Sequence, residues 1–255
     1  MLKKRIIFTL LYQNKSFYLS RNFRLQKIGN LDWLKKNYDF SILTKSVDEI
    51  IILNVSREKN QIEDFSKAIK KFSKECFLPI SAGGKIVDID IAKKYISSGA
   101  DKLVVNTNLF NKTLIKEIAR TFGSQCVIGS IDYIKKKNNF DIYTNNGKEK
   151  STKKIKLVFE YLEKMPIGEI LLNSIDQDGT GNGFDFDILK HVPKNFIKPV
   201  ILSGGAGNYK HILKALKNKK VDSIATANLL NFVGNGLQEA RYLLMRNGIK
   251  LAEWI

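Results

Sequence analysis

Short apolar runs alternate eight times with amphipathic segments along the chain, and most of the runs are rich in Ile, Val and Leu. Such runs are typical of strands that are buried on both faces. Strands that alternate with helices predict a parallel sheet, and eight such units close into a (β/α)8 barrel, with an open doubly wound sheet as the fallback. The strands are expected to start near Arg5, Ile50, Leu78, Leu103, Cys126, Glu169, Pro199 and Ser223, and the helices include 61–72, 89–97, 114–122, 209–217 and 237–246.

Two polar insertions, 12–23 and 135–147, interrupt this alternation. Each follows the end of an expected strand and precedes the next helix. We expect each to form a small hairpin or a flexible loop over the C-terminal face of the barrel, where the βα loops lie.

The two halves of the chain repeat each other. Ala82-Gly83-Gly84 and Ser203-Gly204-Gly205 are 121 positions apart, and Val105-Asn106 and Ala227-Asn228 are 122 apart. In both halves the order is strand, Gly-Gly turn, helix, strand and Asn. The sequence therefore predicts one domain over 1–255, made of half-barrels at about 1–122 and 123–255.

The Gly-Gly turns are candidate phosphate sites. Glycine lets backbone N–H groups approach an anion closely, and the N-terminus of the next helix adds a favourable dipole. Two such sites across one barrel mouth would hold an elongated bisphosphate; the alternative is that the turns serve packing alone. The candidate binding residues are Gly83, Gly84, Asn106 and Thr107 in the first half, and Asp178, Gly179, Ser203, Gly204, Gly205, Ala227 and Asn228 in the second.

The net charge of +18 in 255 residues raises the question of nucleic-acid binding. The lysines are scattered over helix faces and loops, and no nucleic-acid-binding module is evident, so this reading is disfavoured. Cys76 and Cys126 are far apart and indicate buried thiols, with neither a disulfide nor a metal site. We expect no cofactor and no membrane span, and a cytoplasmic location, because the apolar run ending at Leu11 is too short for a signal segment.

Three stretches carry a family resemblance: 119–125 (ARTFGSQ), 168–180 (GEILLNSIDQDGT) and 203–207 (SGGAG). They resemble the cyclase subunit of imidazole glycerol phosphate synthase, and the similarity extends over essentially the whole chain. The resemblance implies a barrel that docks a glutaminase subunit on its N-terminal face and receives ammonia through its interior. In that family the substrate is a ribosyl-linked aminoimidazole carboxamide bisphosphate, cleaved and cyclised at the C-terminal face for histidine synthesis.

The resemblance also implies two catalytic aspartates that act as general acid and general base. Asp132 at the end of the fifth strand matches one of them. The other position, at the end of the first strand, is Leu11, which cannot transfer a proton. The second strand ends with Asn54 where the family has aspartate, and Lys85 replaces the third glycine of the first turn. The departures are therefore concentrated in the N-terminal half of the active site.

The opposite face keeps the family pattern. Arg5 at the start of the first strand matches the family's salt-bridged gate to the ammonia passage, together with Glu49, Lys102 and Glu169 at the starts of the second, fourth and sixth strands. Asp101 and Gln125 match positions near the glutaminase interface. The alternative is that these charges only solvate the barrel floor, because the N-terminal face usually serves stability.

The chain also resembles divergent barrel subunits of bacterial surface-polysaccharide loci, in which a glutaminase and a barrel supply ammonia to a sugar amidotransferase. The leading hypothesis is a paralogue of this kind that channels ammonia, with impaired cyclase chemistry and a phosphorylated small molecule at its C-terminal face. One alternative is a true histidine-pathway cyclase, formally a lyase; another is a non-catalytic binding scaffold. His191 and His211 are expected to be surface residues.

Overall fold

The computed structural model describes residues 3–37, 45–56, 61–137, 139–227 and 236–252. Eight parallel strands pair in a ring, which closes where β10 pairs with β7. This confirms the predicted (β/α)8 barrel, and each strand begins within two residues of its expected start. The barrel strands are β1 (Arg5–Gln13), β4 (Glu49–Asn54), β5 (Ile80–Gly83), β6 (Lys102–Val105), β7 (Val127–Lys136), β10 (Glu169–Ser174), β11 (Val200–Ser203) and β12 (Ser223–Thr226).

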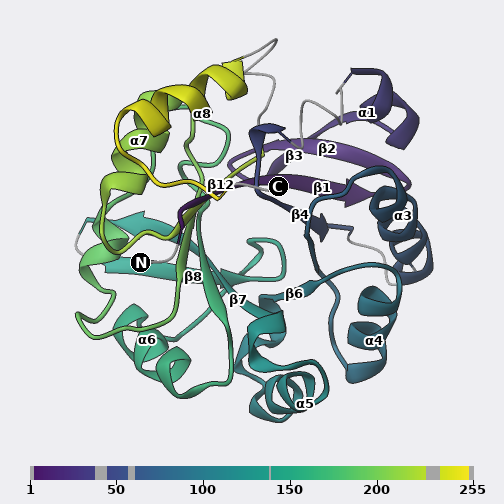
Figure 1. Ribbon diagram of the computed structural model, residues 1–255. Coiled ribbons are helices and arrows are strands. Elements are labelled where there is room, and N and C mark those ends of the chain that lie inside the picture. The colour runs from purple at the N-terminus through teal and green to yellow at the C-terminus, as the bar shows by residue number, and fades with distance from the viewer. Residues whose placement is uncertain (1–2, 38–44, 57–60, 138, 228–235, 253–255) are drawn as a thin grey trace.

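The helices form an outer layer around the strands (Figure 1). Their apolar faces repeat at helical spacing, as in α3, where Phe65, Ile69 and Phe72 are buried against the sheet. The helices are α1 (Leu31–Asn37), α3 (Ile62–Glu75), α4 (Ile89–Ser97), α5 (Lys112–Phe122), α6 (Ile155–Lys164), α7 (Tyr209–Lys217) and α8 (Gly236–Arg246), and short 3-10 helices are η1 (Thr107–Phe110), η2 (Ser124–Cys126) and η3 (Asp187–Lys190).

Alternate residues of each strand point to opposite sides of the sheet. On β1, Ile6, Phe8 and Leu10 belong to the large core between sheet and helices. Ile7 points inward and belongs to a second, smaller core that fills the middle of the barrel. Its members are Ile7, Ile51, Val104, Ile128, Leu171, Ile201 and Ala225, with Leu53 packed against them. This inner core separates the two ends of the barrel interior.

Both polar insertions contain antiparallel hairpins. β1 continues into β2 (Ser16–Arg21) and β3 (Arg24–Gly29), and β7 continues into β8 (Asn139–Thr144) and β9 (Glu149–Lys150). The β2–β3 turn has two central residues with positive φ, Asn22 (51°) and Phe23 (61°), as the tight turns of twisted hairpins require. A bulky Phe is an unusual choice for this left-handed conformation. The hairpin extends beyond the predicted insertion, to Gly29.

At the N-terminal end of the barrel, where the strands start, aspartate carboxylates bond to the backbone of neighbouring strands. The Asp48 carboxylate accepts the backbone N–H of Ile6 at 2.7 Å, Asp101 accepts that of Ile80 at 2.8 Å, and Asp222 accepts that of Val200 at 2.9 Å. Asp101 and Asp222 are 121 positions apart, which is the spacing of the sequence repeat. The half-barrel boundary itself stays a prediction.

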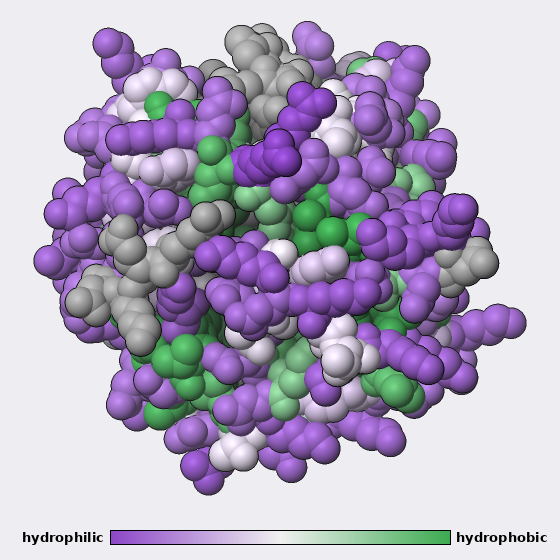
Figure 2. All heavy atoms as spheres, turned by 180° about the vertical axis from the view of Figure 1, so that it is seen from behind, coloured by the Kyte–Doolittle hydropathy of each residue, from purple (hydrophilic) through white to green (hydrophobic). Residues whose placement is uncertain are grey.

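Hydrophilic side chains cover most of the face seen from behind, and apolar residues form small separate areas on it (Figure 2). Among the described residues, no helix is long and apolar enough to cross a membrane. Cys76 is buried as expected, but Cys126 is only partly buried, since it lies in the short η2 helix at a strand start; both thiols are free.

Candidate functional site

A cavity of about 400 Å³ opens at the C-terminal ends of the barrel strands. It lies above the inner core, which fills the middle of the barrel. Eleven of the predicted site residues line it: Leu11, Gly84, Asn106, Thr107, Asp132, Asp178, Gly179, Ser203, Gly204, Gly205 and Ala227. Asn228 lies outside the described residues, and Gly83 is not in the lining.

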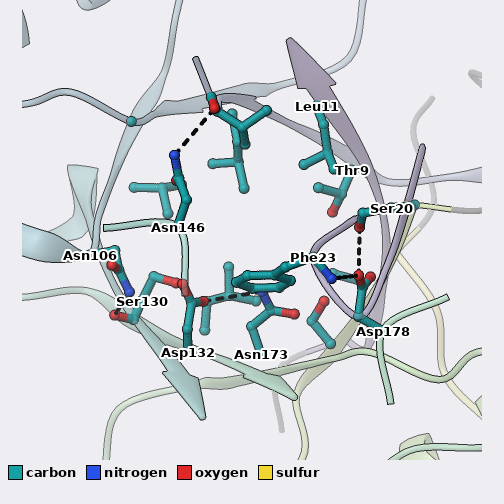
Figure 3. A pocket seen from close by; sticks show the side chains of 18 of the residues that line it. Thr9, Leu11, Ser20, Phe23, Asn106, Ser130, Asp132, Asn146, Asn173 and Asp178 are labelled. Atoms are coloured by element: carbon teal, nitrogen blue, oxygen red, sulfur yellow. Dashed lines mark hydrogen bonds between the residues drawn. The ribbon is translucent and has the colours of Figure 1, made fainter. Parts of the chain in front are cut away.

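Asp132 and Asn173 lie side by side at the floor of this cavity (Figure 3). The register of β7 and β10 pairs the two residues, and the Asn173 amide donates a hydrogen bond of 3.1 Å to Asp132 Oδ1. Burial raises the pKa of the Asp132 carboxyl from 3.8 to about 7; the Asn173 bond opposes this, and the nearby Asp178 charge adds to it. Asp132 can therefore hold or release a proton near neutral pH, as a general acid or base requires.

Leu11 occupies the cavity wall on the β1 side, above Thr9 (Figure 3). It pairs in register with Leu53 of β4, whose side chain also lines the cavity. Asn54 follows on β4, but its side chain is buried and its Oδ1 accepts the Ser56 N–H at 3.1 Å. Together with Leu19 and Leu25 of the hairpin and Val55, these leucines make one wall of the cavity apolar.

In the first half of the barrel, the candidate polar residues after β6 are bonded to other parts of the chain. Thr107 Oγ1 accepts the Asn145 N–H at 3.1 Å, and the Asn106 amide donates to the Ser130 carbonyl at 3.1 Å. Lys85 adopts a positive φ of 61° and lines the cavity. A Cβ on Gly83 would lie 2.6 Å from the Val104 carbonyl oxygen, so this glycine permits close strand packing rather than facing the cavity.

The second Gly-Gly turn, after β11, lies on the other side of the mouth. Ser203, Gly204, Gly205 and Ala227 all line the cavity there. Gly204 has a φ of +93°, and a Cβ on it would come within 2.6 Å of the Ser174 carbonyl oxygen. The backbone can therefore take this course only with glycine, and the turn brings main-chain groups directly to the cavity surface.

The two hairpins meet over the mouth of the cavity. Asp178 Oδ2 accepts hydrogen bonds from Ser20 Oγ (2.6 Å) and the Phe23 N–H (3.1 Å), which bring the Phe23 ring over the cavity (Figure 3). From the other side, the Asn146 amide donates to the Val55 carbonyl at 3.2 Å. A Cβ on Gly147 would lie 2.8 Å from the Phe23 ring, so the turns touch.

At the opposite end, Arg5, Glu49, Lys102 and Glu169 form one closed ring of alternating charges. Arg5 Nη1 lies 2.7 Å from Glu49 Oε2, and Arg5 Nη2 bonds to Glu169. Lys102 Nζ contacts the same two carboxylates, at 3.1 Å from Glu49 Oε2 and 2.7 Å from Glu169 Oε1. Burial opposes ionisation of Glu169, but the bonds to Arg5 and Lys102 outweigh it and lower the Glu169 pKa. The ring is neutral and lies directly below the inner core.

Asp101 and Gln125 are exposed at the same end of the barrel, at the starts of β6 and β7. The Asp101 carboxylate also braces Ile80, so part of its role is structural. His191 and His211 are each partly buried rather than fully on the surface, and His211 Nδ1 accepts the Gly207 N–H at 3.3 Å. Within the described ranges, no group of His, Cys, Asp or Glu residues is arranged to hold a metal ion.

Residues 39–234 match the family model described as histidine biosynthesis protein. An imidazole glycerol phosphate synthase subunit HisF from Dictyoglomus turgidum is 32% identical over 252 residues, which cover 98% of each chain. This chain belongs to the HisF family. The HisF subunit of Chlorobium limicola is 34% identical over 79% of this chain and 81% of its own length. A protein of Parasynechococcus marenigrum, provisionally named imidazole glycerol phosphate synthase subunit hisF2, is 41% identical over all of this chain and 95% of its own length.

The chain is thus a divergent paralogue in the HisF family, more similar to the hisF2 protein than to these two HisF subunits. The three positions at which departures from the family are predicted, Leu11, Asn54 and Lys85, fall on one side of the cavity, between β1 and β5. Asp132 and the second Gly-Gly turn, which are predicted to match the family, lie on the other side.

Sequence reasoning missed four residues that shape the cavity: Ser20, Phe23, Asn146 and Asn173. Asn173 could have been found, because it ends a predicted strand two residues after a buried Leu and so points the same way as Leu171. The other three lie on hairpins whose fold over the mouth is set by tertiary contacts, and no local pattern marks them.

Proposed function

We propose that this chain is a HisF-like synthase subunit that pairs with a glutaminase subunit at its N-terminal face and conducts ammonia through the barrel. Its own cyclase chemistry is impaired, and the ammonia passes to a sugar amidotransferase that forms an acetamidino sugar for a surface polysaccharide. The observation that carries the proposal is the contrast between the two ends of the barrel: a complete charged ring at the entrance, and a leucine opposite Asp132 at the exit.

The charged ring at the N-terminal end has no net charge, which is compatible with the passage of neutral ammonia. Two cations and two carboxylates bond to one another in the ring, so a neutral ammonia molecule meets no net charge. The inner core above the ring is apolar, and apolar surroundings disfavour the charged ammonium ion. Ammonia that enters the barrel is therefore expected to remain unprotonated until it reaches Asp132 and Asn173.

The residues at the C-terminal end of the barrel do not favour efficient cyclisation. An acid–base pair needs two titratable groups, and Leu11 supplies none at the position across the cavity from Asp132. Losing one member of such a pair typically costs about 10²- to 10⁴-fold in rate. A phosphorylated small molecule can bind at the C-terminal face, because the backbone of the second Gly-Gly turn borders the cavity there.

The second candidate is the imidazole glycerol phosphate synthase reaction of histidine biosynthesis, a lyase activity, and the named HisF relatives favour it. It requires Asp132 to act alone or with a substitute carboxylate, Asp178 or Asp176, of which Asp178 lines the cavity. However, Asp178 already accepts bonds from Ser20 and Phe23. A non-catalytic binding scaffold is the minor alternative, supported only by the net charge of +18.

Two assays on the same preparation test the proposal. Cyclase turnover is measured with the bisphosphate substrate and excess ammonium salt, and glutamine hydrolysis by a HisH-type glutaminase is measured with and without the chain. We expect no efficient cyclisation and a clear stimulation of glutaminase. Ordinary cyclase turnover would assign the chain to histidine synthesis, and absence of glutaminase stimulation would refute the ammonia-supplying role.

A ring variant sharpens the test. Glu169→Gln breaks the charge balance of the entrance, whereas Glu163→Gln removes an exposed carboxylate of α6 and serves as the matched control. We expect Glu169→Gln, but not Glu163→Gln, to reduce the share of glutamine-derived ¹⁵N that reaches a sugar amidotransferase product, while ammonium-dependent amidation is unchanged.

A further inference from the structure

The cavity at the C-terminal face is asymmetric in its chemistry. One wall, which we call the leucine wall, consists of Leu11, Leu19, Leu25, Leu53 and Val55. Four of these five side chains are partly exposed, and they come from β1, the β2–β3 hairpin and β4 with the residue that follows it. Apolar surface that faces a water-filled cavity is unfavourable, and an apolar ligand group that covers it gains binding free energy.

The two Gly-Gly turns differ in their suitability for a phosphate. The helix after the first turn, α4, is capped by the Asp88 carboxylate, which accepts the Ile91 N–H at 2.8 Å. The helix after the second turn, α7, is capped by the neutral Asn208. A carboxylate at a helix N-terminus already uses the favourable dipole and repels a second anion, so the second turn is the better anion site.

The polar side chains near the two turns also favour the second turn as the phosphate site. At the first turn, Thr107 and Asn106 are engaged by the hairpin turn and by the Ser130 carbonyl. At the second turn, the Ser203 side chain borders the cavity at the point where the Gly204 and Gly205 backbone also reaches it. The second turn is therefore the less obstructed of the two candidate phosphate positions.

The floor between these regions disfavours a further negative charge. Asp132 and Asp178 both line the cavity, and burial raises the pKa of each carboxyl, to about 7 for Asp132. An anion placed near them would be repelled by either carboxylate when it is ionised. The Asn173 amide and a protonated Asp132 can instead hydrogen-bond to an uncharged polar group.

We propose that the cavity binds a phosphate monoester with an apolar body, the phosphate at the Ser203–Gly205 turn and the body against the leucine wall, and that it discriminates against bisphosphates. The proposal rests on the phosphate-binding part of the proposed function and does not depend on ammonia transfer.

The test compares binding of phenyl phosphate, inorganic phosphate and fructose 1,6-bisphosphate to the purified chain by isothermal titration calorimetry. We expect phenyl phosphate to bind at least about tenfold more tightly than either of the other two, because only it covers the leucine wall. Tighter binding of the bisphosphate would overturn the proposal while leaving phosphate binding intact. No binding of any of the three would refute the phosphate site itself.

Matched substitutions locate the two parts of the ligand. Leu11→Asn, which removes the apolar contact without adding a charge, should weaken phenyl phosphate binding about tenfold and leave inorganic phosphate within about twofold. Ser203→Asp, which puts a negative charge at the second turn, should weaken both probes, whereas Thr107→Asp at the first turn should weaken neither. Circular dichroism shows whether each variant is folded. A loss of phosphate binding in Thr107→Asp or Lys85→Ala, with Ser203→Asp unaffected, would place the phosphate at the first turn and overturn the assignment.

Discussion

At the scale of single residues, Asp132 makes the stability of the fold depend on pH. Burial raises the pKa of its carboxyl to about 7 in the folded chain from an ordinary 3.8, so between these values the folded state holds a proton that the unfolded state has lost. The resulting stabilisation is full below about pH 4 and is lost as pH rises through about 7. Its upper limit is about 4 kcal/mol, since each unit of pKa corresponds to about 1.4 kcal/mol.

Asp132→Asn is expected to remove this dependence. The variant keeps an oxygen to accept the Asn173 hydrogen bond, so it should unfold with nearly the wild-type free energy at pH 4 and with about 1 to 4 kcal/mol more than wild type at pH 8.5. Urea denaturation across this pH range measures the difference. Asp90→Asn, at an exposed position on α4, is the control and should follow the wild-type curve. A parallel curve for Asp132→Asn would show that another group is responsible.

The roles of single residues could be predicted where the sequence repeats a pattern, but not where tertiary packing sets the role of the side chain. The repeat places Gly84 and Gly204 at the cavity, but it treats Gly83 in the same way, although Gly83 is required by the close approach of β6. Asp101 was read as an interface residue, and its carboxylate also braces the Ile80 backbone. Nothing local to Phe23 shows that its ring lies over the cavity.

At the scale of elements, a buried ion pair attaches the last helix to the barrel. Arg241 of α8 bonds to Asp48 at 2.8 Å and 3.1 Å, and Asp48 is fully buried just before β4. Removing one partner leaves an unpaired buried charge, so Arg241→Met should lower the unfolding free energy by about 3 kcal/mol, as measured by urea denaturation. The exposed pair Lys93–Asp90 is the comparison: Lys93→Met should change it by less than about 0.5 kcal/mol. Equal effects would show that the pair does not anchor α8.

Hydrogen bonds from Ser20, Asn22 and Phe23 hold the β2–β3 hairpin over the cavity, and Asp178 accepts three of them, two at its carboxylate and one at its backbone carbonyl. Ser20→Ala removes one hydrogen bond, worth about 1 kcal/mol, and the Asp178 carboxylate keeps the Phe23 N–H as a donor. We expect faster amide exchange at residues 20–25 with little change in global stability, measured by hydrogen–deuterium exchange. Ser97→Ala, which removes an exposed hydroxyl bond on α4, should leave hairpin exchange unchanged. Unchanged exchange in Ser20→Ala would mean that the hairpin is held by other contacts.

The strands and helices were predictable from the sequence, and the hairpins were predictable only as one of two alternatives. Buried strands such as β10 and amphipathic helices such as α7 carry strong local periodicity, so their bounds follow from the pattern. The insertions carry no such pattern, and the sequence left open whether they were hairpins or loops. Their turns use positive φ at Asn14, Lys15, Asn22 and Phe23, where only the asparagines are common in that conformation.

At the scale of the whole molecule, the two ends of the barrel interior are chemically independent. The inner core of Ile7, Ile51, Val104, Ile128, Leu171, Ile201 and Ala225 separates the charged ring from the cavity. Substitutions at the cavity, such as Leu11, can therefore accumulate without disturbing the ring. The proposed combination of an intact entrance ring and an altered cavity is therefore compatible with one stable barrel.

The N-terminal face also exposes large apolar side chains, which are expected contacts for a partner. Phe77 and Ile197 are 91% and 87% exposed, and they precede β5 and β11 at the same end as the charged ring. Exposed aromatic residues near an interface centre often provide much of the binding energy. We therefore expect Phe77→Ser to weaken the affinity for a HisH-type glutaminase about 10- to 30-fold, measured by calorimetry, with stability unchanged. Leu157→Ser, at an exposed position on α6, is the control, and an equal effect of both substitutions would exclude this face as the docking surface.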